Sequence, residues 1–252
     1  MLVLVLLLAL LGGGWLWVRD SPLVSVERVT VTGLRGPDSS QIHSALVGAA
    51  RSMTTLDVRL SALRTAVAPF PIVKGLRVKT QFPHGMRIGV TEQVAVGAVA
   101  ARGRRIAVAS DGTMLPSISA AGLPSIPVSV LPGGSRLTGT GIRGEVALLA
   151  AAPAWLRTHV TQVASTSTNG LTADMHNGLK IYFGTASELR AKWAAAAAVL
   201  ADPGSEGATY IDVTVPQRPA AGGVAGAAQA GQSTVPSGTT STTGTTNGIS
   251  GG

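Results

Sequence analysis

One apolar run opens the chain and limits what the rest of it can be. Leu2 to Val18 contains no charged side chain. In a helix this run would extend about 25 Å, against about 30 Å for the hydrocarbon core of a bilayer. The sequence therefore predicts a transmembrane helix over residues 1–18, in contact with membrane lipid. The residues assigned to this anchor are Leu2, Leu6, Leu10, Trp15 and Trp17, the two tryptophans closing the run as is typical of a membrane–water boundary.

A cleaved signal peptide is the alternative interpretation of this run. Such a peptide carries a basic segment before the apolar stretch and a small-x-small cleavage site after it. No Lys or Arg precedes the run, and its end is Trp-Leu-Trp-Val. Both observations favour an anchor that is kept. The flanking Arg19 and Asp20 cancel, so flanking charges do not orient the helix.

Composition excludes several classes of function. The 20 Lys and Arg against 12 Asp and Glu give a net charge of +8, but the charges are scattered and aromatic residues make up only 4%. Nucleic-acid binding by a basic patch or a stacking platform is therefore not expected. The chain has no cysteine, which excludes disulfides, thiolate metal sites and cysteine nucleophiles.

The first half of the chain has the pattern of a small α+β domain. A strand-like segment over 24–32 is followed by two amphipathic helical segments, 39–51 and 56–67, which end at Pro69. Two short strands over 76–80 and 86–92 come next, with a Pro-containing turn between them. The order β-α-α-β-β predicts a compact domain over residues 21–93.

The second half predicts a mainly antiparallel β domain over residues 94–219. Strand-like segments at 160–165, 171–175 and 180–183 are separated by two Asn-Gly pairs, which favour type I′ turns and hence neighbouring antiparallel strands. Helices are expected at 145–157 and 187–200. From residue 220 to 252 no charge occurs and Gly, Ser, Thr and Ala dominate, so this segment is predicted to be a disordered tail.

The sequence contains no complete catalytic or cofactor-binding motif. Residues 139–144 match G-x-G-x-x-G, but no acid occurs between Glu145 and Asp174, where a ribose-binding acid would be required. The four histidines show no metal-ligand spacing, and no G-x-S-x-G elbow occurs. We therefore expect no catalytic, cofactor-binding or metal residue, no small-molecule substrate and no enzyme activity.

One segment does suggest binding. The strand-like run at the end of the folded region is followed only by a Pro-rich stretch and the tail, so it is predicted to be an edge strand that can accept a strand from a partner. An ordinary edge blunted by Pro216 and Pro219 is the alternative. The predicted partner-binding residues are Tyr210, Ile211, Asp212, Val213, Thr214 and Val215.

Several short segments, taken in order, resemble one family. They are Val29-Thr-Val-Thr-Gly33, Leu56-Asp57-Val58, Phe70-Pro71-Ile72-Val73, Phe82-Pro83-His84-Gly85, Ile88-Gly-Val90-Thr-Glu92, Asp111-Gly112, Ile181-Tyr182-Phe183-Gly184 with Leu189 and Lys192, and Tyr210-Ile211-Asp212-Val213. Over about residues 1–220 the chain resembles the FtsQ/DivIB family of bacterial cell-division proteins. Where the family often has Arg and an aromatic residue after its Tyr-x-Asp-Leu element, this chain has Thr214 and Val215.

The resemblance implies a fold and a role. The fold would be an N-terminal transmembrane helix, a POTRA domain and a β domain outside the plasma membrane. The role would be that of a non-enzymatic scaffold at the division septum, which binds bitopic partners of the FtsB/DivIC and FtsL type at the C-terminal edge of the β domain. The alternatives are a POTRA-type transport or chaperone module, and a secreted or membrane-anchored cell-wall enzyme.

Overall fold

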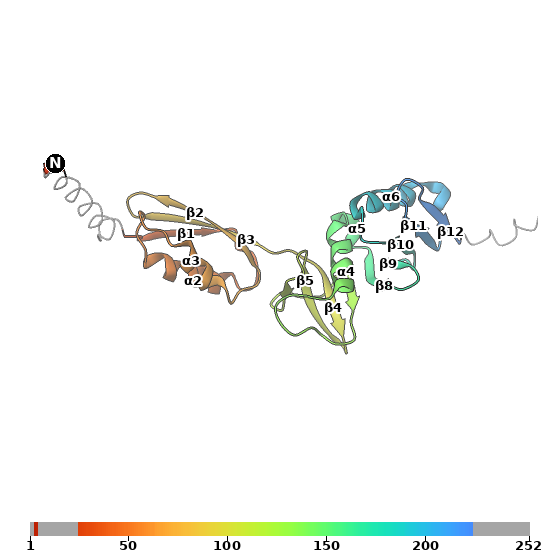
Figure 1. Cartoon of the computed structure of the whole chain (residues 1–252), viewed down its shortest axis with the longest axis horizontal. Helices are drawn as coiled ribbons and strands as arrows, with labels where there is room; N and C mark the ends of the chain where they lie inside the picture. Colours follow the sequence, from red (N-terminus) through yellow and green to blue (C-terminus); the bar gives the residue numbers. More distant parts are fainter. Residues whose placement is uncertain (1–2, 5–24, 224–252) are drawn as a thin grey trace, which may run out of the picture.

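The computed structural model describes residues 3–4 and 25–223 as an α+β chain with two sheets (Figure 1). The predicted anchor residues Leu2, Leu6, Leu10, Trp15 and Trp17 lie outside the described residues, as does the chain after Gly223. Among the residues that are described, no helix is long and apolar enough to cross a bilayer.

The first sheet has the predicted β-α-α-β-β order. Its elements are β1 (Arg28–Thr32), α2 (Ser39–Arg51), α3 (Leu60–Val67), β2 (Val73–Gln81) and β3 (Gly85–Glu92). The strands lie in the order β1-β3-β2, with β1 parallel and β2 antiparallel to the central β3. Because the helices lie between β1 and β2 in sequence, they cover one face of the sheet and leave the other open (Figure 1).

Apolar periodicity explains why these elements pack together. In α2 the buried residues Ile42, Leu46 and Ala50 recur at a spacing of four, which places them on one face of the helix. In β3 the buried Met86 and Ile88 alternate with exposed or half-buried residues, as expected for a strand with one covered face. The two sets belong to the same buried cluster.

The second sheet has nine strands in the order β12-β11-β10-β9-β8-β7-β4-β5-β6. Its strands are β4 (Ala95–Ala101), β5 (Arg104–Ala109), β6 (Met114–Leu115), β7 (Ser125–Pro127), β8 (Val160–Thr166), β9 (Gly170–Met175), β10 (Lys180–Gly184), β11 (Tyr210–Asp212) and β12 (Ala220–Gly222). The predicted meander β8-β9-β10 is confirmed as antiparallel.

Five of the eight strand pairs in this sheet are antiparallel, as predicted, but the sheet is mixed because three pairs are parallel. The pairs β4–β7, β7–β8 and β10–β11 are parallel. Helix α6 (Leu189–Ala201) explains the last of these, since it carries the chain over the sheet between β10 and β11, and such a crossover returns the next strand in the same direction. The pair β7–β8 is joined at a single register position, Ser125 opposite Gln162.

The Asn-Gly turns also differ from the prediction. Gly170 and Gly178 have φ angles of 63° and 83°, but among the described non-glycine residues only Arg102 and Glu188 have positive φ. A type I′ turn needs positive φ at both central residues, so neither turn is of that type. The antiparallel pairing is therefore not produced by type I′ geometry but by the apolar alternation of the strands, which buries Leu171, Ala173 and Met175 in turn.

Three helices cover one face of the larger sheet. They are α4 (Thr140–Ala151), α5 (Ala154–Arg157) and α6, followed by the short 3-10 helix η2 (Pro203–Ser205). The single helix expected over 145–157 is split in two, because Pro153 has no N–H to continue the helical bonding. Helix α4 packs against β4, β7, β8 and β9, and so it crosses the β7–β8 pair.

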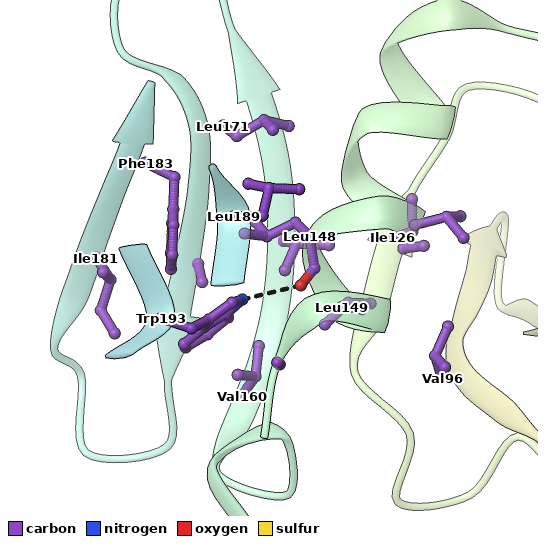
Figure 2. Packing of buried hydrophobic residues seen from close by; sticks show 14 of the residues in the cluster. Val96, Ile126, Leu148, Leu149, Val160, Leu171, Ile181, Phe183, Leu189 and Trp193 are labelled. Carbon is purple, nitrogen blue, oxygen red and sulfur yellow. Dashed lines mark hydrogen bonds between the residues drawn. The ribbon is translucent and has the colours of Figure 1, made fainter. Parts of the chain in front are cut away.

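Trp193 lies at the centre of this core. Its side chain is fully buried, and its ring centroid is 4.6 Å from that of Phe183. The indole Nε1–H donates to the carbonyl oxygen of Leu148 at 2.9 Å, which ties α6 to α4 (Figure 2). A buried indole needs such an acceptor, because an unpaired polar group in the core is costly.

The two sheets are joined at Gln93. Its backbone N–H donates to the Ile72 carbonyl at 2.7 Å, and its side-chain Nε2 donates to Asp111 Oδ2 at 3.2 Å. Arg136 forms an ion pair with the same carboxylate oxygen at 2.9 Å. Partial burial acts to raise the pKa of Asp111, but hydrogen bonds from Thr113 and Gln93 and the charge of Arg136 outweigh it and lower that pKa.

Candidate partner-binding edge

The C-terminal end of the larger sheet is formed by β10, β11 and β12. Strand β11 pairs with β10 on one side and with β12 on the other. The prediction that Tyr210–Val215 forms the edge of the sheet is therefore wrong in two respects. The strand ends at Asp212, and β12 occupies the position at the edge.

Strand β12 also corrects the predicted start of the disordered tail. Ala220, Ala221 and Gly222 lie opposite Asp212, Ile211 and Tyr210, so the sheet continues beyond Pro219. Ala-Ala-Gly has little intrinsic strand propensity, which is why the sequence pattern missed it. The pairing comes instead from the backbone N–H and C=O groups on the side of β11 away from β10, which would be unpaired without β12.

A side chain in place of the glycine at the end of β12 would displace the neighbouring tyrosine. A Cβ atom added to Gly222 would lie 2.4 Å from the hydroxyl oxygen of Tyr210 and 2.5 Å from its Cζ. The Tyr210 ring thus covers the backbone of β12 at this position. On its other side the ring lies 5.9 Å from that of Tyr182, centroid to centroid. Tyr210 therefore connects all three strands at the edge.

The six predicted residues divide between the two faces of the sheet. Ile211 and Val213 are buried in the core of the domain and do not reach the surface. Tyr210, Asp212 and Thr214 lie on the open face, where Tyr210 is 40% exposed. Val215 lies beyond the strand and is also exposed. Because successive side chains of a strand point to opposite faces, only every second residue of the predicted set lies on the open face.

Asp212 and Thr214 form a small local hydrogen-bonded unit. Asp212 Oδ1 accepts hydrogen bonds from the backbone N–H of Thr214, at 2.8 Å, and from the Thr214 hydroxyl. This bonding turns the chain out of β11 at the point where Val213 donates its N–H to the Tyr182 carbonyl at 2.9 Å. The carboxylate of Asp212 is half-buried and is engaged within its own turn.

A shallow hollow lies beside these residues on the open face. The residues that line it are Thr168, Asn169, Gly170, Tyr182, Gly184, Thr185, Tyr210, Asp212 and Thr214. Gly170 and Gly184 line this hollow where the backbones of β9 and β10 approach closely. A Cβ atom at Gly170 would lie 2.3 Å from the Gly184 carbonyl oxygen, and one at Gly184 would lie 2.7 Å from Thr214 Cγ2. Tyr182 and Gly184 are not among the predicted partner-binding residues, although both lie in the motif Ile181-Tyr182-Phe183-Gly184.

A buried lysine holds the edge strands to the helix behind them. Lys192 on α6 is 1% exposed, and its Nζ donates to the carbonyl oxygens of Phe183, at 2.8 Å, and Thr185, at 2.9 Å. Burial lowers the pKa of Lys192, while the negative charge of Glu188 opposes that change. The amine satisfies carbonyls at the end of β10 that would otherwise lack donors.

The chemistry of this edge suits main-chain recognition. A free strand edge offers backbone N–H and C=O groups to an added strand, and the adjacent tyrosines offer apolar surface. Within residues 3–4 and 25–223, no three His, Asp or Glu side chains gather where they could hold a metal ion.

Two family models match consecutive parts of the chain. Residues 24–93 match the model described as "POTRA domain, FtsQ-type", and residues 93–214 match "Cell division protein FtsQ/DivIB, C-terminal". The chain belongs to the FtsQ/DivIB family. The two models meet at Gln93, the residue that joins the two sheets. Members of the FtsQ/DivIB family are non-enzymatic cell-division proteins that act in the divisome with other cell-division proteins, and so is this chain.

Two relatives illustrate the likeness. "Cell division protein FtsQ" of Streptomyces collinus is 29% identical over 236 residues, which cover 88% of each chain. Among solved structures, the major extracytoplasmic domain of the trans isomer of DivIB from Geobacillus stearothermophilus is 15% identical. The alignment covers 41% of this chain and 87% of the DivIB domain, with a TM-score of 0.32.

Proposed function

We propose that this FtsQ/DivIB protein is a bitopic scaffold of the divisome at the division septum. In this proposal, residues 1–18 anchor it in the plasma membrane, the bulk of the chain is extracytoplasmic, and the C-terminal sheet edge recruits membrane partners of the FtsB/DivIC and FtsL type. The observation that carries the proposal is the placement of β12 at the end of a sheet, beside a hollow lined by two tyrosines.

The partner is expected to add a strand at the open side of β12. Three residues offer only a few backbone hydrogen bonds, each contributing about 0.5–1.5 kcal/mol net. Micromolar binding requires about 8 kcal/mol, so backbone pairing alone is insufficient. Side chains of the partner that reach Tyr210 and Tyr182 would contribute further, because aromatic contacts add to the area they bury.

Anchoring in the same membrane would supply the remaining affinity. Two proteins held in one bilayer meet at a raised effective concentration, which strengthens a weak contact without adding any new interaction. The proposed scaffold therefore needs only a modest interface. A short strand with small side chains, such as β12, is then adequate.

Two truncations separate β12 from the tail that follows it. A chain ending at Pro219 lacks β12, whereas a chain ending at Gly223 keeps β12 and lacks only the tail. We expect the longer chain to capture an FtsB/DivIC-type partner in a membrane pull-down as the full chain does, and the shorter chain to lose most of that capture. Thermal unfolding of both chains checks that the domain remains folded.

The outcome that contradicts the edge model is equal capture by the two truncated chains. The same model predicts that Ala221→Val leaves capture intact, because Ala221 is exposed and a β-branched residue suits a strand. Gathering of a fluorescently tagged chain at mid-cell tests the septal location separately from the edge.

A further inference from the structure

Over its three strands β1–β3, the open face of the POTRA sheet carries positive side chains and no negative one. On β3 the buried Met86, Ile88 and Val90 point toward the helices, so Arg87 points to the open face. The register then places the side chains that share this face. They are Arg28, Thr30 and Thr32 on β1, Gly75, Arg77, Lys79 and Gln81 on β2, and Gly85, Arg87, Gly89 and Thr91 on β3.

Two of the cations lie directly opposite each other. Lys79 of β2 pairs with Arg87 of β3, and like charges at such positions destabilise a sheet. Positive side chains on an edge strand deter unwanted pairing, but Arg87 lies on the central strand, where no edge needs protection. Glu92 is the one acid of the three strands, and its carboxylate accepts hydrogen bonds from the backbone N–H groups of Arg35 and Gly36. Repulsion on the open face is thus left uncompensated by any acid of the sheet.

The cations gather at the end of the domain where the chain enters. Ser25 forms a bridge with Thr54, and Val26 donates its N–H to the Met53 carbonyl at 3.1 Å, so the chain is fixed to the domain from residue 25. The apolar run ends at Val18. Seven residue steps of at most about 3.6 Å cannot exceed about 25 Å, so this end of the domain lies close to the end of that run.

An exposed aromatic side chain marks the same end. Phe82 in the turn between β2 and β3 is 73% exposed. His84 lies two residues later in the same turn. Its backbone carbonyl accepts hydrogen bonds from the backbone N–H groups of Glu27 and Arg28 at 3.0 Å each, which places the turn beside the start of β1. Aromatic rings are favoured at the headgroup level of a bilayer, and flanking cations bind anionic headgroups.

We propose that this end of the POTRA domain docks on the anionic lipid headgroups of the bilayer, with Arg28, Lys79 and Arg87 facing the phosphates and Phe82 entering the interface. The inference rests on the proposed anchoring of residues 1–18. A bilayer fits better than a peptide because the three strands place only Thr, Gly, Gln, Arg and Lys on this face, with no apolar side chain to hold one from a peptide. Docking fixes the height and tilt of the sheet edge that recruits partners.

The magnitude follows from the number of cations near the surface. Each Lys or Arg close to an anionic membrane favours the bound state by about fivefold. Arg28 lies two residues along the strands from Lys79 and Arg87, about 7 Å, which is within the Debye length of about 8 Å at physiological salt. Removing two of these cations should therefore weaken docking roughly 25-fold.

The absence of cysteine permits a direct test in the full chain. A fluorophore is placed at Thr30→Cys on the basic face, or at Ser44→Cys on the exposed side of α2 as a control, and energy transfer to labelled lipid headgroups is measured. The chain is reconstituted in phosphatidylcholine bilayers with and without phosphatidylglycerol. We expect transfer from position 30 to exceed that from position 44 only with phosphatidylglycerol, and high salt to remove the difference.

Matched variants assign the effect to the face. Lys79→Gln with Arg87→Gln should abolish the excess transfer, whereas Arg102→Gln with Arg104→Gln, which removes two exposed cations from the other domain, should not. Phe82→Ser should weaken docking in the same direction, while Val130→Ser, at another exposed apolar residue, should leave it unchanged.

The possible outcomes are distinguishable. Equal transfer from positions 30 and 44 in a chain that resists alkaline extraction overturns docking but leaves the anchored scaffold intact. Release of the chain by alkaline extraction overturns the anchoring and the docking together. A response of the Thr30→Cys probe to soluble polyphosphate but not to phosphatidylglycerol shows that the face binds a free anionic polymer, and it also overturns the proposal.

Discussion

Replacing the buried lysine behind the candidate partner-binding edge should destabilise the C-terminal domain. Lys192→Met keeps the methylene stem but removes the amine that donates to the Phe183 and Thr185 carbonyls at 2.8 and 2.9 Å. One buried carbonyl left without a donor costs about 1–3 kcal/mol, and the half-buried Thr185 carbonyl costs less. Relief of the cost of burying a charge offsets part of this. We therefore expect a net loss of about 1–3 kcal/mol.

Urea unfolding followed by tryptophan fluorescence measures this loss, because Trp193 is buried next to the site. Arg190→Met on the same helix is the matched control, since Arg190 is exposed and such a change should alter stability by less than about 0.5 kcal/mol. If Lys192→Met is as stable as this control, or more stable than the unaltered chain, the cost of burying the amine exceeds the value of its hydrogen bonds. The reasoning would then be refuted.

Three further changes are expected to have measurable effects. Burial raises the pKa of Glu145 above its ordinary 4.5, and its Oε2 has no hydrogen-bond partner. The group therefore stabilises the fold below pH 4.5 and loses this contribution as pH rises through its folded pKa, so Glu145→Gln should raise the melting temperature near neutral pH and leave it unchanged in acid. Trp193→Phe removes the donor to the Leu148 carbonyl and should cost about 2–4 kcal/mol by urea unfolding. Gly222→Val should collide with Tyr210 and expose the β11 amides to hydrogen exchange, whereas Ala221→Val should not; unchanged protection in both would contradict the role of Gly222.

Periodicity in the sequence predicts much of the fold because it reports burial directly. The β-α-α-β-β unit and the antiparallel meander both follow from apolar residues at regular spacing, such as Ile42 and Leu46 on α2. The parallel β10–β11 pair could not be read from alternation, since a strand buried in a sheet has the same pattern whichever direction its neighbour runs.

The candidate site was predicted only in part, for a physical reason. Tyr210 and Asp212 reach the open face as an alternating strand requires, but the position of a strand within a sheet depends on residues that pair with it from elsewhere. Ala220–Gly222 pairs through its backbone alone and has no side-chain signal. Tyr182 enters the site from β10 only because the two strands are in register, Tyr182 opposite Asp212.

The continuity of the nine-stranded sheet gives the domain a mechanical property. A force applied to β12 would pass sideways from strand to strand toward β6, the last strand of the sheet at its other end. The strand pair with the fewest paired residues in the sheet is β7–β8, where only Ser125 and Gln162 are paired. Helix α4 packs across the β7–β8 pair and contacts strands on both sides of it, so it also connects the two halves of the sheet. A force applied at the candidate edge would thus be carried by α4 as well as by the β7–β8 pair.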